Sequence, residues 1–137
     1  KDKFYRDFKD ISDSMHIDSL MGWSRSGAKD FTLGMSKKTL IHKEWIVCPE
    51  PFYSLAVNFN GQVSICCVDW SMGTLVGDLR TESLKDIWFG ESLKRFRFIH
   101  LEGRRNELTA CANCSYLNQL DDLSNLDGVR HKLQEML

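Results

Sequence analysis

The sequence predicts an α+β fold in which a small β-hairpin and several helices are organised around four cysteines. Two apolar runs, FYSLAVNF and QVSICCVDW, lie on either side of Asn60-Gly61, a residue pair typical of tight turns between antiparallel strands. Apolar residues recur every three or four positions in several other segments, which indicates helices. The third observation is the cysteine pattern, which includes a C-x2-C pair formed by Cys111 and Cys114.

The side-chain faces of the hairpin decide between two turn lengths. A two-residue loop would pair apolar side chains with polar ones, whereas a three-residue loop with Gly61 in a left-handed bulge gathers the apolar residues on one face. The favoured register pairs three positions: Val57 with Val63, Leu55 with Ile65, and Tyr53 with Cys67. Because neighbouring strand residues face opposite ways, we expect Cys67 in the apolar core and Cys66 on the other face, among small residues that leave room for a bulky inorganic group.

Four helices are predicted, together with short extended segments and a polar linker. The helix after the hairpin can be capped by Thr81 or Ser83, and Gly90 is its expected end. The predicted segments are a helix over 1–15, a strand over 17–21, a linker over 24–44, an extended piece from Thr74, the helix before Gly90, a helix over 91–103 with Leu93, Phe96, Ile99 and His100 on one side, and a C-terminal helix over 122–137.

Composition and charge exclude several classes of protein. A chain of 137 residues can form one domain with a modest core, and its 42% hydrophobic and 27% charged residues are ordinary for a globular protein. The net charge of −1 gives no electrostatic footprint for nucleic acid. No apolar run approaches the roughly 18–20 residues that span a bilayer, and no signal peptide is visible. We therefore expect a cytoplasmic protein that binds neither nucleic acid nor membrane, and the start at Lys1 inside an expected helix indicates a fragment of a longer chain.

The five cysteines predict a metal site rather than a disulfide framework, because their number is odd and no secretory signal is present. Cys111 and Cys114 are close enough for one turn to direct both sulfurs at one metal, and antiparallel pairing of the hairpin can bring Cys48 and Cys66 together. Four thiolates are a frequent ligand set for zinc and for iron–sulfur clusters, and the spacing does not separate the two. A third interpretation is a redox protein that works through a Cys111–Cys114 dithiol alone.

A series of motifs runs through residues 48–114, about half of the chain: Cys48-Pro49, the Phe59-Asn60-Gly61 turn, the Gly61-x4-Cys66 step, Cys66-Cys67-Val68-Asp69, Gly77-Asp78-Leu79, Ser83-Leu84-Lys85-Asp86-Ile87-Trp88, the Arg97-to-Gly103 helix end and Cys111-Ala112-Asn113-Cys114. In content and order these motifs resemble the SPASM domain, the C-terminal extension of many radical S-adenosylmethionine (radical SAM) enzymes. The chain is most similar to the short, four-cysteine version of that domain, found beside sugar- and peptide-modifying radical SAM proteins.

The resemblance implies an auxiliary [4Fe–4S] cluster held by Cys48, Cys66, Cys111 and Cys114, with Cys66 selected over Cys67. It divides the chain into the end of a partial (β/α)6 radical SAM barrel with a bridging segment (1–45), the cluster-binding domain (46–119) and a C-terminal helix (120–137). The C-x3-C-x2-C loop that a radical SAM core needs for its SAM-reducing cluster is missing from this sequence. The chain alone is therefore expected to be inactive, with no catalytic residue, and SAM would bind only to a core domain of the same parent chain, its expected partner.

For the parent enzyme, an oxidoreductase or modifying enzyme, the resemblance implies radical chemistry on a peptide or a small sugar-type substrate. The cluster would accept an electron or position substrate, and full ligation by four cysteines favours electron transfer because it leaves no open iron. Ser64, Asn113 and the backbone near Gly77 are candidate tuning groups, since nearby hydrogen bonds set cluster potentials. Asp69 and Trp70 could meet substrate at the cluster edge. The alternative is a non-enzymatic protein in which the same four cysteines bind a structural zinc.

Overall fold

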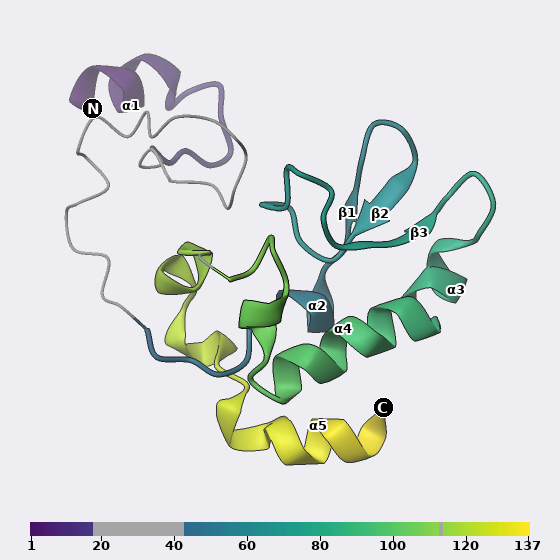
Figure 1. The fold of residues 1–137 in the computed structure, drawn as a ribbon. Helices are drawn as coiled ribbons and strands as arrows, with labels where there is room; N and C mark the ends of the chain where they lie inside the picture. The colour runs from purple at the N-terminus through teal and green to yellow at the C-terminus, as the bar shows by residue number, and fades with distance from the viewer. Residues whose placement is uncertain (18–42, 113) are drawn as a thin grey trace.

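The computed structural model describes residues 1–17, 43–112 and 114–137. The helices and strands, shown in Figure 1, follow in this order: α1 (Asp2–Phe8), α2 (Glu50–Tyr53), β1 (Ala56–Val57), β2 (Gln62–Ser64), β3 (Leu75–Asp78), α3 (Leu84–Phe89), α4 (Glu91–Leu101) and α5 (Arg130–Met136). Short 3₁₀ turns lie at Arg105–Glu107, Tyr116–Gln119, Asp122–Ser124 and Asp127–Val129. The combination of helices with one small antiparallel sheet confirms the predicted α+β class.

The three strands form one sheet in the order β1-β2-β3. The hairpin between β1 and β2 has the predicted three-residue loop, because Val57 pairs with Val63 and Gly61 adopts a φ of +86°. The amide of Gly61 donates to the carbonyl oxygen of Asn58 (2.9 Å), which closes the loop. The extended piece predicted from Thr74 leads into β3, which pairs with β2 and completes the sheet.

Both strands of the hairpin are shorter than predicted. Helix α2 replaces the start of the first strand, so Tyr53 lies in a helical turn and does not pair with Cys67. At the other end β2 stops at Ser64, and the amide of Asp69 donates to the carbonyl oxygen of Cys66 (3.3 Å) to close a turn. The prediction that Cys67 lies in the core is therefore wrong: the alternation of a strand ends before this residue, and the turn leaves its side chain exposed.

Helices α3 and α4 follow the predicted pattern closely. Ser83, rather than Thr81, caps α3, because its Oγ accepts a hydrogen bond from the amide of Asp86 (3.1 Å). Helix α4 ends before Gly103, whose φ of +73° is the left-handed conformation that glycine adopts at helix ends. The predicted apolar side of α4 faces inward, since Leu93, Ile99 and His100 are buried.

The two terminal helices are shorter than predicted. Helix α1 covers Asp2–Phe8 instead of 1–15 and buries none of its residues, so its aromatic side chains remain exposed. The predicted helix over 122–137 is two 3₁₀ turns followed by α5, and Gly128, a poor helix former, lies in the second of these turns. The strand predicted over 17–21 and the linker over 24–44 fall almost entirely outside the described residues.

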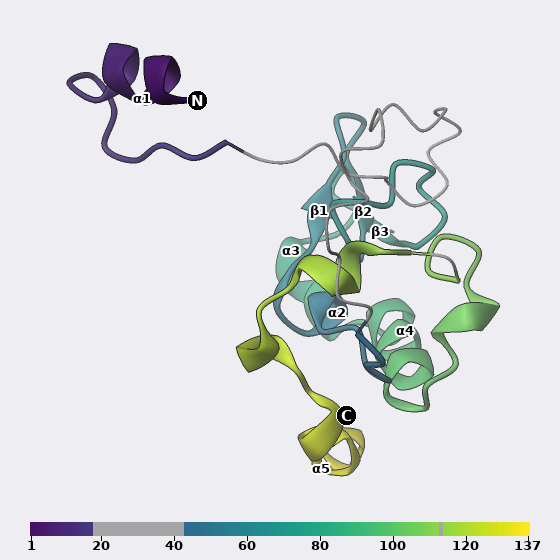
Figure 2. The ribbon, with the colours of Figure 1, turned by 90° about the vertical axis from the view of Figure 1, so that its left-hand side faces the viewer.

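The core lies between the sheet and the helices that follow it. Figures 1 and 2 show α4 between the sheet on one side and α5 on the other. The central cluster consists of buried side chains from β2, β3, α3 and α4 and the segment just after β2: Val63, Ile65, Val76, Ile87 and Leu93. No helix among the described residues combines the length and the apolar character needed to cross a membrane.

The C-terminal segment packs against the chain that leads to Cys48. The carboxylate of Asp127 accepts hydrogen bonds from the amides of Ile46 (3.0 Å) and Val47 (2.8 Å), about eighty positions away in sequence. Lys43 makes a further link, because its ammonium group donates to Asp122 (2.6 Å). These contacts fix the position from which Cys48 enters the centre of the molecule.

Candidate metal centre

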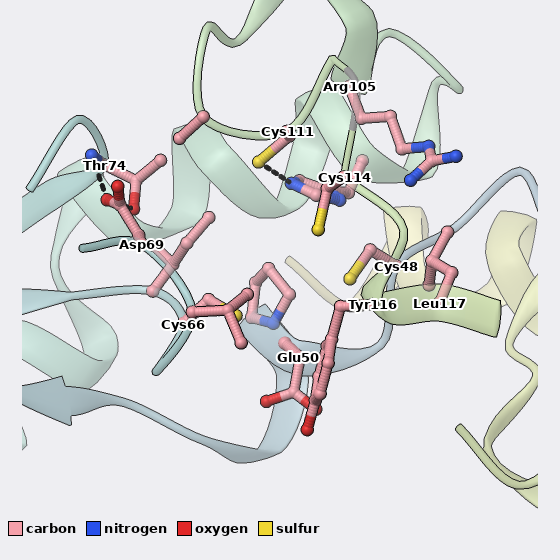
Figure 3. A pocket seen from close by; sticks show the side chains of 15 residues that line it. Cys48, Glu50, Cys66, Asp69, Thr74, Arg105, Cys111, Cys114, Tyr116 and Leu117 are labelled. Carbon is pink, nitrogen blue, oxygen red and sulfur yellow. Dashed lines mark hydrogen bonds between the residues drawn. The ribbon is translucent and has the colours of Figure 1, made fainter. Parts of the chain in front are cut away.

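One pocket collects all four of the predicted cysteine ligands. Fifteen residues line it, and Figure 3 shows the sulfur atoms of four of them pointing into the same space. We call these residues the four pocket cysteines: Cys48, Cys66, Cys111 and Cys114. Cys67 does not line the pocket and is exposed.

Three separate segments deliver the four pocket cysteines. Cys48 lies two residues before α2, and Cys66 lies in the turn that follows β2. Cys111 and Cys114 come from the loop after the 3₁₀ turn Arg105–Glu107, where the amide of Cys114 donates to the carbonyl oxygen of Cys111 (3.2 Å). That hydrogen bond closes the single turn expected of a C-x2-C pair, and the turn brings the two thiols to one side of the pocket.

The thiols of the pocket hold their protons strongly in the absence of metal. Burial raises the pKa of Cys48 and of Cys111 to about 12, and it also raises the pKa of Cys66. The neighbouring thiols add to the effect: Cys111 and Cys114 raise the pKa of Cys48, and Cys48 raises that of Cys66. Such coupling requires the sulfurs to be near one another. A metal ion or cluster that binds here must displace protons, which makes its affinity depend on pH.

Two buried carboxylates line the pocket beside the thiols. Glu50 is 7% exposed and accepts a hydrogen bond from the hydroxyl of Ser54 (2.6 Å). Asp69 is 5% exposed and accepts from the amide and the hydroxyl of Thr74 (2.7 and 2.6 Å) and from the amide of Gly73 (3.1 Å). Asp69 therefore organises the loop between Cys66 and β3. These hydrogen bonds give the Asp69 carboxylate a structural role. The neighbouring side chain of Trp70 is 63% exposed.

His100 and Arg105 form the wall of the pocket nearest Cys111. His100 is 1% exposed, and its Nε2 lies 3.9 Å from the Sγ of Cys111, the contact drawn as a dashed line from that sulfur in Figure 3. Burial, with a smaller effect from positively charged Arg105, lowers the pKa of His100 to about 4. The ring is therefore neutral near pH 7. The sequence pattern predicted that His100 lies on the inner side of its helix, but it did not predict this contact.

The candidate tuning residues named from the sequence lie elsewhere. Ser64 is fully buried in β2, does not line the pocket, and accepts a hydrogen bond from the side-chain amide of Asn58 (3.0 Å). Asn113 falls outside the described residues. His100, which the sequence analysis placed only on one side of its helix, lies instead against the thiol of Cys111.

The donor set fits a group that takes several thiolate ligands. In the described part of the chain no three His, Cys, Asp or Glu side chains are close enough to hold one metal ion. The four pocket cysteines instead surround a shared space, and four thiolates are the ligand set of [4Fe–4S] clusters as well as of structural zinc. Buried apolar side chains such as Ile65 and Leu117 complete the walls and exclude water from one side of that space.

Comparison with known protein families gives a match that contains the four pocket cysteines. Residues 48–115 match the family model of SPASM, described as an iron-sulfur cluster-binding domain. Neither the curated proteins nor the solved structures include a match to this chain. The matched segment begins at Cys48 and extends one residue past Cys114, so it contains all four pocket cysteines. The resemblance inferred from the sequence is thereby confirmed, and residues 48–115 belong to the SPASM family of iron–sulfur cluster-binding domains.

Proposed function

We propose that the four pocket cysteines bind one auxiliary [4Fe–4S] cluster, and that this chain is the accessory part of a cytoplasmic radical SAM oxidoreductase or modifying enzyme. The observation that carries the proposal is that four cysteines from three segments line one pocket inside a segment of an iron–sulfur cluster-binding family. The partner is the radical SAM core domain of the same parent chain, with residues 1–45 as the end of its barrel and the bridge, and the substrate is a peptide or a small sugar-type molecule.

The residues of the pocket favour electron transfer over direct binding of substrate to iron. When bound, a [4Fe–4S] cluster supplies a one-electron redox centre whose potential depends on burial and on hydrogen bonds to its sulfurs. Four cysteine thiolates would occupy one coordination position on each of four irons and leave none open for substrate. Ile65, Leu117 and the other buried residues of the wall hold the thiols in a medium of low polarity, which strengthens every charge interaction within the pocket.

A structural zinc is the competing occupant, and the positions of the thiols bear on the choice. Zinc–sulfur bonds of about 2.3 Å in a tetrahedral site would draw four sulfurs to within about 4 Å of one another. Thiolates that bind four different irons stay further apart, around a central volume. In the described part of the chain no three His, Cys, Asp or Glu side chains are close enough to hold one metal ion, and this observation supports the cluster together with the family match.

The two adjacent cysteines provide a matched pair of variants to test the proposal. Cys66 lines the pocket and Cys67 is exposed, although only one position separates them in the chain. After anaerobic reconstitution, the wild-type chain and Cys67→Ser should contain iron and sulfide in equal amounts and absorb broadly in the visible. Cys66→Ser should lose most of that iron and absorption.

Two results would contradict the proposal. The first is a colourless wild-type chain that keeps one tightly bound zinc and takes up no iron or sulfide under anaerobic reconstitution. The second is a Cys67→Ser variant that loses as much iron as Cys66→Ser, which would mean that the two cysteines are not divided between the pocket and the surface.

A further inference from the structure

We propose that His100 is a positioning residue for the cluster: its Nε2–H donates a hydrogen bond to the Sγ of Cys111 and raises the reduction potential of the site. The inference deepens the proposed function and rests on it, because it assigns a role to a side chain that is not a ligand. It also identifies which of the four pocket cysteines is electronically distinct from the others.

The geometry is the first argument. His100 lies in the last turn of α4, a helix of eleven residues held in the core by Leu93 and Ile99, so its ring is attached to a rigid element. Its Nε2 is 3.9 Å from Cys111 Sγ, at the outer limit of a hydrogen bond to a neutral thiol. When Cys111 binds iron it does so as a thiolate, and a charged acceptor gives a shorter and stronger hydrogen bond.

The second argument is the cost of placing an imidazole here. Among the described residues, His100 Nδ1 is the one buried side-chain nitrogen or oxygen atom without a hydrogen-bond partner. A buried polar atom left in this state is costly, whereas leucine or methionine at the same position would have no polar atom to satisfy. The contact of Nε2 with Cys111 is a hydrogen bond that histidine can make here and an apolar residue cannot.

The donor at Nε2 does not depend on the charge of the ring. A neutral ring with its proton on Nε2 and a doubly protonated ring both present an N–H toward Cys111. The neutral form with its proton on Nε2 leaves Nδ1 as the acceptor without a hydrogen-bond partner. Arg105 also lines the pocket and lowers the pKa of Cys111, so both groups place positive potential near this cysteine.

A donor that faces a cluster sulfur stabilises the reduced state more than the oxidised state, because the reduced cluster carries one more negative charge. Removing the donor should therefore lower the reduction potential. We expect the equilibrium constant for reduction to fall about tenfold, which for a one-electron couple corresponds to about 59 mV.

Two substitutions separate the donor from the bulk of the side chain. His100→Leu fills the wall without a donor, while His100→Gln places an amide N–H close to the position of Nε2. The full chain, wild type and both variants, would be reconstituted anaerobically and titrated with a reductant while the reduced cluster is followed by electron paramagnetic resonance. The expected order is a potential lowered by about 59 mV in His100→Leu and a potential close to wild type in His100→Gln. Iron and sulfide analysis would verify that the variants hold equal amounts of cluster.

A measurement on the wild type covers the case in which the variants do not fold. With ¹⁵N-labelled histidine, the reduced cluster should show a weak nitrogen hyperfine coupling, as a hydrogen bond through sulfur produces. Equal potentials in the wild type and His100→Leu, or no nitrogen coupling, would overturn the role of His100 and leave cluster binding intact. A strong coupling, typical of nitrogen bound directly to iron, would also overturn it. A wild-type chain without any cluster would remove the proposed function itself.

Discussion

Adding one methyl group at Gly77 should destabilise the domain, chiefly by overlap with the side chain of Ile87 and to a smaller degree by a close contact with Glu82 Oε2 (3.0 Å). Gly77 lies in β3 where α3 packs against the sheet, and an ideal Cβ built there would lie 2.5 Å from Cγ1 and 2.7 Å from Cδ1 of Ile87. Ordinary carbon–carbon contacts are about 3.5–4.0 Å, so the overlap is about 1 Å. Ile87 is 1% exposed and has no free volume to move into. We expect Gly77→Ala to lower the free energy of unfolding by about 1–3 kcal/mol, the usual cost of overpacking a core.

A double-mutant cycle tests the cause of that loss. Ile87→Ala removes the two closest atoms that meet the new methyl group and leaves Glu82 Oε2 (3.0 Å), the end of a flexible side chain. Gly77→Ala should therefore cost less than about 1 kcal/mol in that background, although Ile87→Ala itself costs about 2–5 kcal/mol. Gly128→Ala is the matched control, since no atom lies within 4 Å of its added Cβ, and it should change stability little. Urea unfolding of each variant in one defined metal state gives the four energies. Equal losses from Gly77→Ala with and without Ile87 would refute the packing argument.

Three further contacts give measurable predictions. Arg97 is buried and donates from Nε to the carbonyl oxygen of Pro51 (2.9 Å), so Arg97→Met should lower the free energy of unfolding by about 1–3 kcal/mol and reduce iron uptake, as seen by urea titration and iron analysis. Asp127→Ala removes two hydrogen bonds to the segment before Cys48 and should lower the free energy of unfolding by about 1–2 kcal/mol, measured by the same titration. An unchanged free energy of unfolding would mean that other contacts hold this segment. Arg80 lowers the pKa of Asp78 to about 2, so this pair contributes stability above the ordinary carboxyl pKa and loses it as the pH falls through about 2. In Arg80→Ala the carboxyl carbon of Asp78, followed by NMR, should titrate near its ordinary pKa of 3.8 instead of about 2.

The register of the hairpin was predictable because two independent constraints agree on it. Apolar residues gather on one face only with a three-residue loop, and that loop requires the positive φ that Gly61 adopts. The same reasoning failed at Cys67, because it extended the strand three residues past its real end at Ser64. The strand ends where the chain turns into the loop that Asp69 organises by accepting hydrogen bonds from Gly73 and Thr74, and a period of two residues carries no information about such side-chain contacts.

The four pocket cysteines were predictable as a set, whereas their surroundings were not. A C-x2-C pair and a hairpin with cysteines at its base are local features that can be recognised in the sequence. The order of the motifs along the chain then indicates the family. His100 stands at helical spacing with Leu93 and Ile99, which is the pattern of an ordinary core residue. Its contact with Cys111 depends on how the chain after Gly103 folds back over α4. The available signal was a polar residue on an apolar helix face, eleven positions before a candidate ligand.

The position of Cys48 explains why the fold and the metal site depend on each other. On one side, Asp127 near the C-terminus holds the two backbone amides of Ile46 and Val47; on the other, Arg97 of α4 holds the carbonyl oxygen of Pro51. Cys48 is thus fixed between two contacts that join segments about fifty and eighty residues apart. The linkage between the contacts and the site is reciprocal. The free energy by which the contacts favour binding at the four pocket cysteines equals the free energy by which binding stabilises the contacts. Destabilising either contact should therefore weaken metal binding without any change in the ligands, and loading the site should raise the urea concentration at which the entire domain unfolds.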